Sequence, residues 1–331
     1  MAKKATIRDL ANAANVSVTT VSQILNGKGQ RFSNETRQKV LTLQQELNYV
    51  PDFNARNLIM KSSKTIGVLV PNIGNPFFST FIKGIQKKSR ELKFTPFVFS
   101  ANHDEKLETY YLKQLVERAT DGLIIASASI TDDALDQILK RNRIPYLLLD
   151  QNTIVDGDRI ETDDINGGRI AADHLLSLGH QHFTMVMPSE PTNNLVRRLQ
   201  GFQERLKEDG KQVSVIYSPM TKQGGYEATD EVLATDATAI FAINDEMAIG
   251  LYRGLREKDL RVPQDLSIMG YDDIDLDEYV QPKLTTVHQP IMQMGEQATD
   301  LLVDRIQHPN AEVKTIHLPV NLVIRDSTAN V

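Results

Sequence analysis

Short apolar runs alternate with longer amphipathic segments through most of this chain. Runs rich in Val, Ile, Leu and Phe predict strands at residues 64–72, 95–101, 121–127, 145–151, 182–188, 212–218, 239–245 and 266–273. Apolar residues at helical spacing predict helices between them, at residues 75–92, 105–119, 165–178, 195–209 and 245–258. Continuous apolar strands are typical of parallel sheets that helices cover on both faces. Because these strands are too many for one small sheet, the pattern predicts an α/β body of two doubly wound parallel-sheet lobes.

The first 49 residues follow a helical period throughout and predict a small all-α head. Thr6, Ser17 and Ser33 each precede an apolar helical pattern and can serve as N-caps. The first two helices are short and separated by a turn of about three residues, which is the helix-turn-helix pattern. The third helix is predicted to pack on them through Val40, Leu43 and Leu47.

The second helix of the head has a small polar side opposite its apolar face. That side carries Val18, Thr19, Ser22 and Gln23. A glutamine can pair with adenine, and methyl groups of Val or Thr can contact the thymine methyl, so these side chains suit base edges in a major groove. A small helical domain that docks on another protein would show the same periodicity, and periodicity alone does not separate the two.

A short segment, residues 50–61, connects the head to the body. Pro51 prevents continuation of the third helix. Residues 54–60 can form one or two helical turns, but roughly 12–15 residues are needed for a helix that is stable alone in water. We therefore predict a head at residues 1–49, a hinge at 50–61 that is ordered only by a partner, and a body at 62–331.

Charge is distributed unevenly along the chain. The formal net charge is −6, yet residues 1–61 hold nine Lys or Arg against four Asp or Glu, and the remainder holds 28 against 39. A basic head on an acidic body indicates that one end of the protein meets phosphate.

The sequence lacks several features that mark exported, membrane and metal-binding proteins. The chain has no cysteine, which excludes disulfides and thiolate metal sites. No apolar run approaches the roughly 20 residues of a membrane span, and residues 1–16 lack the apolar core of a secretory signal. We therefore expect a cytoplasmic protein with no membrane partner.

Polar and aromatic side chains gather where the predicted strands end. Because the carboxyl ends of parallel strands meet at one edge of a sheet, these side chains are expected to face the cleft between the lobes. Aromatic faces can cover the C–H surface of a sugar, while carboxylates, amides and an arginine bind its hydroxyls. The predicted set is Asn75, Phe77, Phe78, Asp150, Gln151, Arg198, Asn244, Asp272 and Gln289.

No motif in the chain requires catalysis. GxSxG, HExxH, P-loop and GxGxxG motifs are absent, so we predict no catalytic residue and no cofactor. A glycosidase that uses Asp150 and Asp272 is an alternative, but it leaves the basic head unexplained. We interpret His174, His180 and His182 as solvent-facing, and predict no metal site.

Three segments of the head and hinge carry a resemblance to a known family. They are ATIRDLANAANVSVTTVSQILNG, ETRQKV and LNYVPDFNARNL, which resemble the lactose-repressor/galactose-repressor family of bacterial transcription regulators. The resemblance implies that operator bases are read by Val18, Thr19 and Gln23. It implies that phosphates are contacted by Thr6, Ser17, Thr20, Ser22 and Asn26.

The same resemblance gives the hinge a role. It implies that two hinges pair across a homodimer on double-stranded operator DNA, where Leu58, flanked by Ala55 and Arg56, enters the minor groove. The alternative is that Leu58 is a core leucine of a linker helix. The chain stops at VNLVIRDSTANV without a leucine heptad tail, so we expect a dimer and not a tetramer.

The body is similar to the periplasmic sugar-binding-protein fold. The segments NPFF, LD, FAINDEMAIG, GYDD and HQP, with the arginine of RLQGF, resemble ribose-binding protein. By that resemblance the predicted set above contacts a sugar, and ribose is the expected ligand. Gln151 stands where that protein has an arginine, and Met220 where an aromatic residue is expected.

These observations lead to one functional hypothesis with alternatives. We expect a transcriptional repressor whose operator affinity is controlled by a small sugar, ribose, acting as inducer. A regulator of this family that responds to another sugar, a purine or a partner protein is the alternative. A sugar-binding transport or chemoreceptor component would need export, and no signal for it is present.

Overall fold

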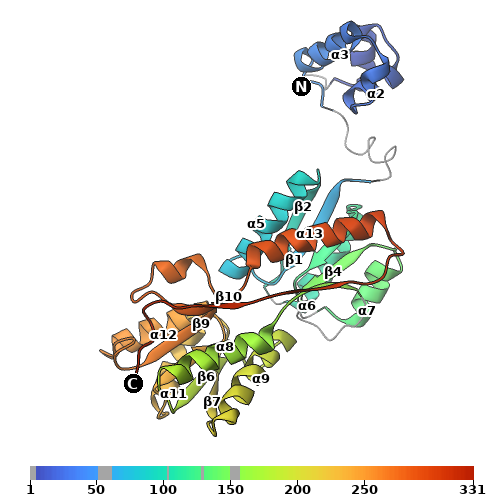
Figure 1. Cartoon of the computed structure of the whole chain (residues 1–331). Helices are drawn as coiled ribbons and strands as arrows, with labels where there is room; N and C mark the ends of the chain where they lie inside the picture. Colours follow the sequence, from blue (N-terminus) through green and yellow to red (C-terminus); the bar gives the residue numbers. More distant parts are fainter. Residues whose placement is uncertain (1–4, 51–61, 103, 128–129, 150–156) are drawn as a thin grey trace. The chain divides into compact units, whose positions relative to one another are not determined.

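The protein is described by a computed structural model over residues 5–50, 62–102, 104–127, 130–149 and 157–331. Its internal contacts divide the chain into two units, residues 1–63 and 64–331, and each is described by itself (Figure 1). Most of the predicted hinge, residues 51–61, lies outside the described residues. The boundaries predicted at residues 49 and 61 therefore stay a prediction.

The head has the predicted helices and caps. Its elements are α1 (Ile7–Ala14), α2 (Val18–Leu25), the 3-10 turn η1 (Gly29–Arg31) and α3 (Asn34–Glu46). The side chains of Thr6, Ser17 and Ser33 each accept a hydrogen bond from a backbone N–H of the first turn that follows, as N-caps do. The helix-turn-helix prediction is confirmed.

The core of the head differs from the prediction at the end of α3. Leu43 packs against the core, but Leu47 is exposed, and Tyr49 is buried in its place. Asn48 adopts a left-handed conformation with φ 47°, and the N–H of Tyr49 donates to the carbonyl of Gln44 over 2.9 Å. The chain therefore turns back at the helix end and brings Tyr49 onto the core.

The body contains two six-stranded sheets, one in each lobe, which confirms the predicted fold class. The first lobe holds, in spatial order, β2 (Thr95–Ser100), β1 (Thr65–Val70), β3 (Gly122–Ile125), β4 (Tyr146–Leu149), β5 (Asp158–Thr162) and β11 (Thr315–Leu318), all parallel. The second holds β7 (Val213–Tyr217), β6 (Phe183–Met187), β8 (Ala239–Ala242), β9 (Ser267–Asp272), β10 (Thr285–His288) and β12 (Asn321–Val323). Only β12 is antiparallel to its neighbour in these ladders.

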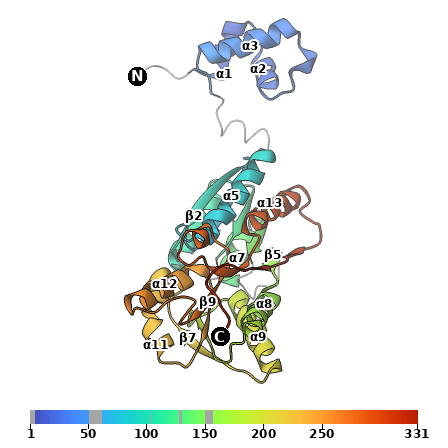
Figure 2. The same cartoon turned by 60° about the vertical axis from the view of Figure 1, so that its left-hand side comes forward.

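Helices cover the faces of both sheets. Those of the first lobe are α5 (Pro76–Glu91), α6 (Glu105–Glu117), α7 (Asp132–Leu135), the π-helical η2 (Asp136–Lys140) and α13 (Ile291–Gln307). Those of the second are α8 (Asp164–Ser177), α9 (Asn193–Glu208), α10 (Lys222–Glu227), α11 (Thr229–Leu233), α12 (Asp245–Glu257) and the 3-10 turn η3 (Asp275–Glu278). Figures 1 and 2 both show α5 beside α13 and α8 beside α9.

The chain passes between the two lobes three times. The first crossing leads from β5 to α8, the second from β10 to α13, and the third from β11 to β12 (Figure 2). α13 packs on α5, so the second crossing returns the chain to the core of the first lobe. Each of the three crossings thus carries the chain from one core to the other. These crossings are the segments across which a movement of one lobe must act on the other.

Four strands were not predicted, namely β5, β10, β11 and β12. They are short, and β5 has the sequence DRIET, with a single apolar side chain at Ile160. Its residues alternate between buried and half-buried positions, so only one face is covered. A short strand of this kind lacks the continuous apolar run that marks the central strands.

Two of the three histidines interpreted as solvent-facing are buried. His174 Nε2 lies 2.9 Å from the hydroxyl of Thr328, and His180 bonds with Thr238 (2.8 Å) and Ser267 (3.1 Å). The C-terminal residues pack against this part of the second lobe, which hides both rings. The prediction was wrong for His174 and His180, because the covering segment is distant in sequence.

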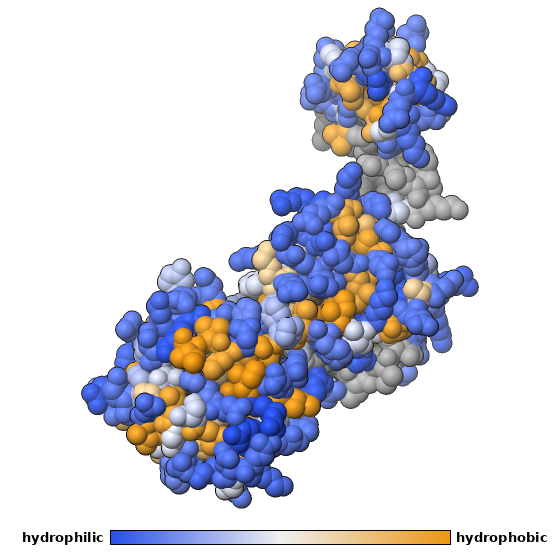
Figure 3. All heavy atoms as spheres, in the orientation of Figure 1, coloured by the Kyte–Doolittle hydropathy of each residue, from blue (hydrophilic) through white to orange (hydrophobic). Residues whose placement is uncertain are grey.

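Most of the visible surface is polar, and apolar side chains gather in patches on both lobes (Figure 3). Among the described residues, no helix is long and apolar enough to cross a membrane.

The buried histidines predict a pH-dependent stability. Burial lowers the pKa of His174 and of His180 below the ordinary 6.5, so the unfolded chain binds protons more readily than the folded protein. The free energy of unfolding should therefore fall as the pH drops below 6.5. Urea unfolding between pH 5 and pH 8 should show a weaker fall in His174→Gln than in the native chain. The control is the change of the exposed Gln212 to Ala, which removes no titratable group and should leave the pH profile as it is. An unaltered profile in His174→Gln would contradict this origin.

Candidate functional site

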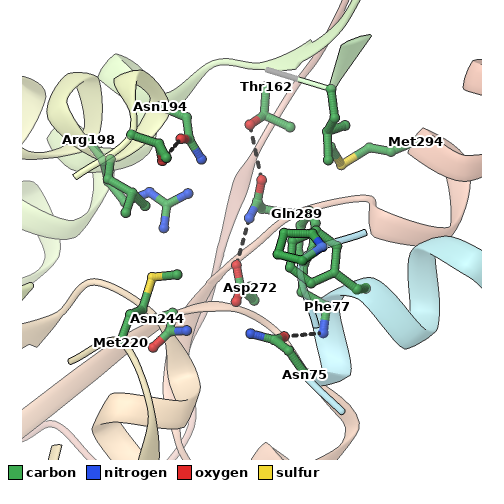
Figure 4. A pocket seen from close by; sticks show the side chains of 15 residues that line it. Asn75, Phe77, Thr162, Asn194, Arg198, Met220, Asn244, Asp272, Gln289 and Met294 are labelled. Carbon is green, nitrogen blue, oxygen red and sulfur yellow. Dashed lines mark hydrogen bonds between the residues drawn. The ribbon is translucent and has the colours of Figure 1, made fainter. Parts of the chain in front are cut away.

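A cavity of about 100 Å³ lies within the body, between its two lobes. A single water needs about 10–15 Å³ of such space, so the cavity holds several waters or one small ligand. It is lined by Pro71, Asn75, Phe77, Phe78, Leu149, Thr162, Thr192, Asn194, Leu195, Arg198, Met220, Asn244, Asp272, Gln289 and Met294. Figure 4 shows the polar side chains from both lobes converging on it.

The first lobe contributes an aromatic wall at the start of α5. Asn75 is the N-cap, and its Oδ1 accepts from the N–H of Phe77 over 2.8 Å, which leaves its amide N–H groups as donors. Phe77 and Phe78 meet edge to face with ring centroids 5.1 Å apart. Phe78 is part of the lobe's core, whereas Phe77 is half-buried. The cap thus fixes both the amide and the first aromatic ring.

Arg198 is the only basic residue among the described residues that line the cavity. Its Nε and Nη2 donate to Asp164 Oδ1 over 3.2 and 2.9 Å, and its Nη1 donates to the carbonyl of Ile243 over 2.6 Å. The guanidinium carbon lies 3.3 Å from the ring centroid of Tyr271, whose hydroxyl also donates to Asp164. These bonds use three of the five N–H donors and leave two for a ligand.

The second lobe places polar groups at its strand ends. Asn244 caps α12 and accepts from the N–H of Met247 over 3.0 Å, so its amide N–H groups are donors. Asp272 ends β9 and accepts from Gln289 Nε2 over 2.6 Å. The hydroxyl of Thr162 lies 3.0 Å from Gln289 Oε1, which continues the chain of bonds toward the first crossing (Figure 4).

The backbone at Asp272 is strained. Asp272 has φ 123° and Asp273 has φ 62°, in the region that favours glycine. The side chains hold them there: Asp272 is bound by Gln289, and Asp273 is bound by His288 and Arg325. Residues held in such conformations cluster at functional sites.

Carboxyl groups gather at Asp272 and in the layer behind it. Burial raises the pKa of Asp272 well above its ordinary range, and the nearby Asp245 raises it further, while Arg198 lowers it. Behind it, burial raises the pKa of Asp277 to about 7, and that of Asp245 is also raised by burial. A hydroxyl that donates to Asp272 would stabilise its charged form. Gly270 makes this layer possible, since a Cβ there would lie 2.1 Å from Asp245 Oδ1.

The cavity brings together most of the predicted ligand residues. Seven of the set line it: Asn75, Phe77, Phe78, Arg198, Asn244, Asp272 and Gln289. Asp150 and Gln151 lie outside the described residues, so their placement stays a prediction. Sequence reasoning missed Thr162, Thr192 and Asn194. Thr162 ends a strand that was not predicted, but Thr192 directly precedes α9 and could have been found as a helix N-cap.

The head presents the predicted recognition residues on α2. Val18 and Thr19 are exposed and Ser22 is half-buried. Gln23 Oε1 is buried and has no hydrogen-bond partner in the part of the chain that is described, so turning it toward a base would break no such bond.

The residues that are expected to contact DNA phosphates also make hydrogen bonds within the head. Thr6 and Ser17 are N-caps, Thr20 hydrogen-bonds with Ser17, and the Asn26 amide donates to the carbonyl of Ser22 over 2.8 Å. Ala55, Arg56 and Leu58 lie outside the described residues.

Both units of the chain match known protein families. Residues 6–52 match the family described as bacterial regulatory proteins, lacI family, and residues 172–328 match a periplasmic binding protein-like domain. The chain is 35% identical to the HTH-type transcriptional regulator DegA of Bacillus subtilis, with 98% of both chains covered.

Solved structures are similar too. A LacI family transcriptional regulator from Enterococcus faecium with bound ribose is 44% identical, with TM-score 0.77, and the match covers 81% of this chain and 99% of that one. The lac repressor dimer bound to operator and an anti-inducer is 28% identical, with TM-score 0.88, over 99% of this chain and all of that one.

The strain at Asp272 predicts an unusual order of stability. Asp272→Gly should be more stable to urea than Asp272→Ala by about 1 kcal/mol, because glycine adopts φ 123° without strain. Both changes remove the same carboxylate, so the difference reports on the backbone. At Asp236, which has no positive φ, glycine should be no more stable than alanine. Equal stability of the two Asp272 variants would contradict the strain.

Proposed function

The chain belongs to the lacI family of bacterial regulatory proteins, and on that premise we propose that it is a ribose operon repressor which releases its operator when D-ribose binds the body. It is a DNA-binding transcription regulator with an effector-binding domain, and its family is not one of enzymes. The proposal concerns the effector, the direction of its effect and the residues that hold it.

One observation carries the choice of a small neutral sugar. Two aromatic rings from the first lobe face a carboxylate, an arginine and several amides from the second across one cavity. Aromatic faces cover C–H groups, Asp272 accepts from hydroxyls, and the free N–H groups of Arg198, Asn75 and Asn244 donate to them. A hydroxyl both donates and accepts, so a pentose matches this mixture of partners.

The charge of the cavity argues against a phosphorylated effector. Arg198 is already bonded to Asp164, and Asp272 is the second charged side chain in the described lining. A phosphate would meet the carboxyl group of Asp272 and a single arginine whose charge is already shared with Asp164. The ribose bound to the Enterococcus faecium regulator supports an uncharged pentose. In our proposal Asp150 and Gln151 also contact the sugar.

The head and the hinge make the contacts with DNA. α2 enters the major groove, where Val18, Thr19 and Gln23 read bases, and the phosphate contacts come from Thr6, Ser17, Thr20, Ser22 and Asn26. In the hinge, Leu58 enters the minor groove beside Ala55 and Arg56. The lac repressor dimer on its operator supports this arrangement.

We further propose that the active species is a homodimer. Large apolar side chains are exposed on the body, among them Ile73, Phe97, Leu276, Tyr279 and Ile324. Apolar side chains gather in patches on both lobes (Figure 3), and exposed apolar patches are typical of surfaces that meet another protein. A dimer places two heads on one pseudo-palindromic operator.

Titration calorimetry tests the effector. The full-length protein should bind D-ribose saturably, and Asp272→Ala should weaken binding by about 10- to 100-fold, the range for losing a hydrogen bond to a charged group. The exposed Asp236→Ala is the matched control and should bind as the native chain does. Heat from another sugar or a purine, but none from ribose, would overturn ribose and keep the regulator. If neither ribose nor another sugar nor a purine gave heat of binding, a partner protein would be favoured as the effector.

Operator binding tests Gln23. On a duplex selected by the protein from random DNA, Gln23→Ala should weaken binding by about 5- to 150-fold, as expected for one lost bidentate base contact of about 1–3 kcal/mol. Binding to unrelated DNA should change little, because phosphates dominate it. The exposed Gln45→Ala on α3 is the control. An equal loss on both kinds of DNA would show that Gln23 does not read a base.

A further inference from the structure

A chain of hydrogen bonds runs through two of the three crossings beside the cavity. Thr162 is the last residue of β5 and begins the first crossing, and Gln289 follows β10 in the second. Thr162 Oγ1 lies 3.0 Å from Gln289 Oε1 and 3.2 Å from Asp164 Oδ2. One bond joins the two crossings, whereas the other stays within the first.

A threonine hydroxyl has one proton, so it donates to one of these oxygens at a time. Both are acceptors. Gln289 Nε2 donates to Asp272 over 2.6 Å, which turns Oε1 toward Thr162, and Asp164 is bonded to Arg198 through its other oxygen. The Thr162 hydroxyl therefore has two alternative bonds of similar length, and only the bond to Gln289 joins one crossing to another.

The groups at both ends of this set face the cavity. Asp272, Gln289 and Arg198 line it together with Thr162. Thr162 is buried except where it borders the cavity. Gln289 Oε1 has two lone pairs, so a ligand hydroxyl that donates to it shares this acceptor with Thr162, weakens the Thr162–Gln289 bond and favours donation of the threonine hydroxyl to Asp164.

We infer that the Thr162 hydroxyl is the positioning group through which an effector alters the connection between the lobes, an inference that rests on the proposed function. Without effector, the Thr162–Gln289 bond ties the first crossing to the second. With effector on Gln289, the Thr162 hydroxyl turns to donate to Asp164, and the hydrogen bond between the two crossings is lost. An effector shifts an equilibrium only by its difference in affinity for the two states, and this bond supplies part of that difference.

The test is the coupling between ribose and operator. The ratio of the ribose Kd measured with and without saturating operator DNA should fall toward 1 in Thr162→Val, by about three- to tenfold, the net range of one hydrogen bond. Any direct effect of Thr162 on ribose affinity cancels in this ratio. Thr162→Ser retains the hydroxyl and should keep the native ratio. A native ratio in Thr162→Val would overturn the inference and identify Thr162 as a simple lining residue.

A second measurement needs no effector. Hydrogen exchange of the free protein should be faster in Thr162→Val than in the native chain over residues 160–166 and 286–292, and unchanged over β8. Thr162→Ser should restore slow exchange, and Thr162→Ala replaces the valine variant if that one folds poorly. Unchanged exchange in both crossings would overturn the tie itself. If the native chain shows no ribose coupling, the ribose proposal fails, and this exchange measurement still decides the role of Thr162.

Discussion

The fully buried pair of Arg198 and Asp164 is the interaction on which the cavity depends. Burying both charges is costly, and the cost is offset by their mutual hydrogen bonds and by further partners: Asp164 Oδ1 accepts from two guanidinium nitrogens and from Tyr271, and Arg198 Nη1 donates to the carbonyl of Ile243. The pair also requires α8 and α9 to touch. A Cβ at Gly168 would lie 2.0 Å from the carbonyl oxygen of Arg198, and one at Gly201 would lie 1.9 Å from that of Ile165.

This pair links the ligand side of the cavity to the crossings. Asp164 stands in the first turn of α8, directly after the first crossing, and Arg198 points into the cavity from α9. A sugar that binds Arg198 and Asp272 therefore acts on groups that are bonded to both crossings. Rigid helix packing on either side makes the crossings the part of the body that can respond, as a hinge between two packed cores does.

The central strands, the head helices and most cavity residues could be predicted from the sequence, because each is marked by a pattern of nearby residues. Asp272 ends an apolar strand, Asn75 and Asn244 lie shortly after one, and Thr6, Ser17 and Ser33 precede helical patterns. The features that could not be predicted depend on contacts between residues that are distant in the sequence. Strand β5 has little apolar content, the burial of His174 and His180 comes from the C-terminal residues, and the bond of Asp164 to Arg198 joins positions 34 residues apart.

The central claim is that ribose in the body controls operator binding by the head. The most direct measurement is fluorescence anisotropy of a labelled duplex, selected by the protein from random DNA and held by the full-length protein, during titration with D-ribose. The account predicts that anisotropy falls to the value of free DNA, and that L-arabinose at the same concentrations has a smaller effect. An operator complex that stays intact or tightens while calorimetry shows bound ribose would contradict it.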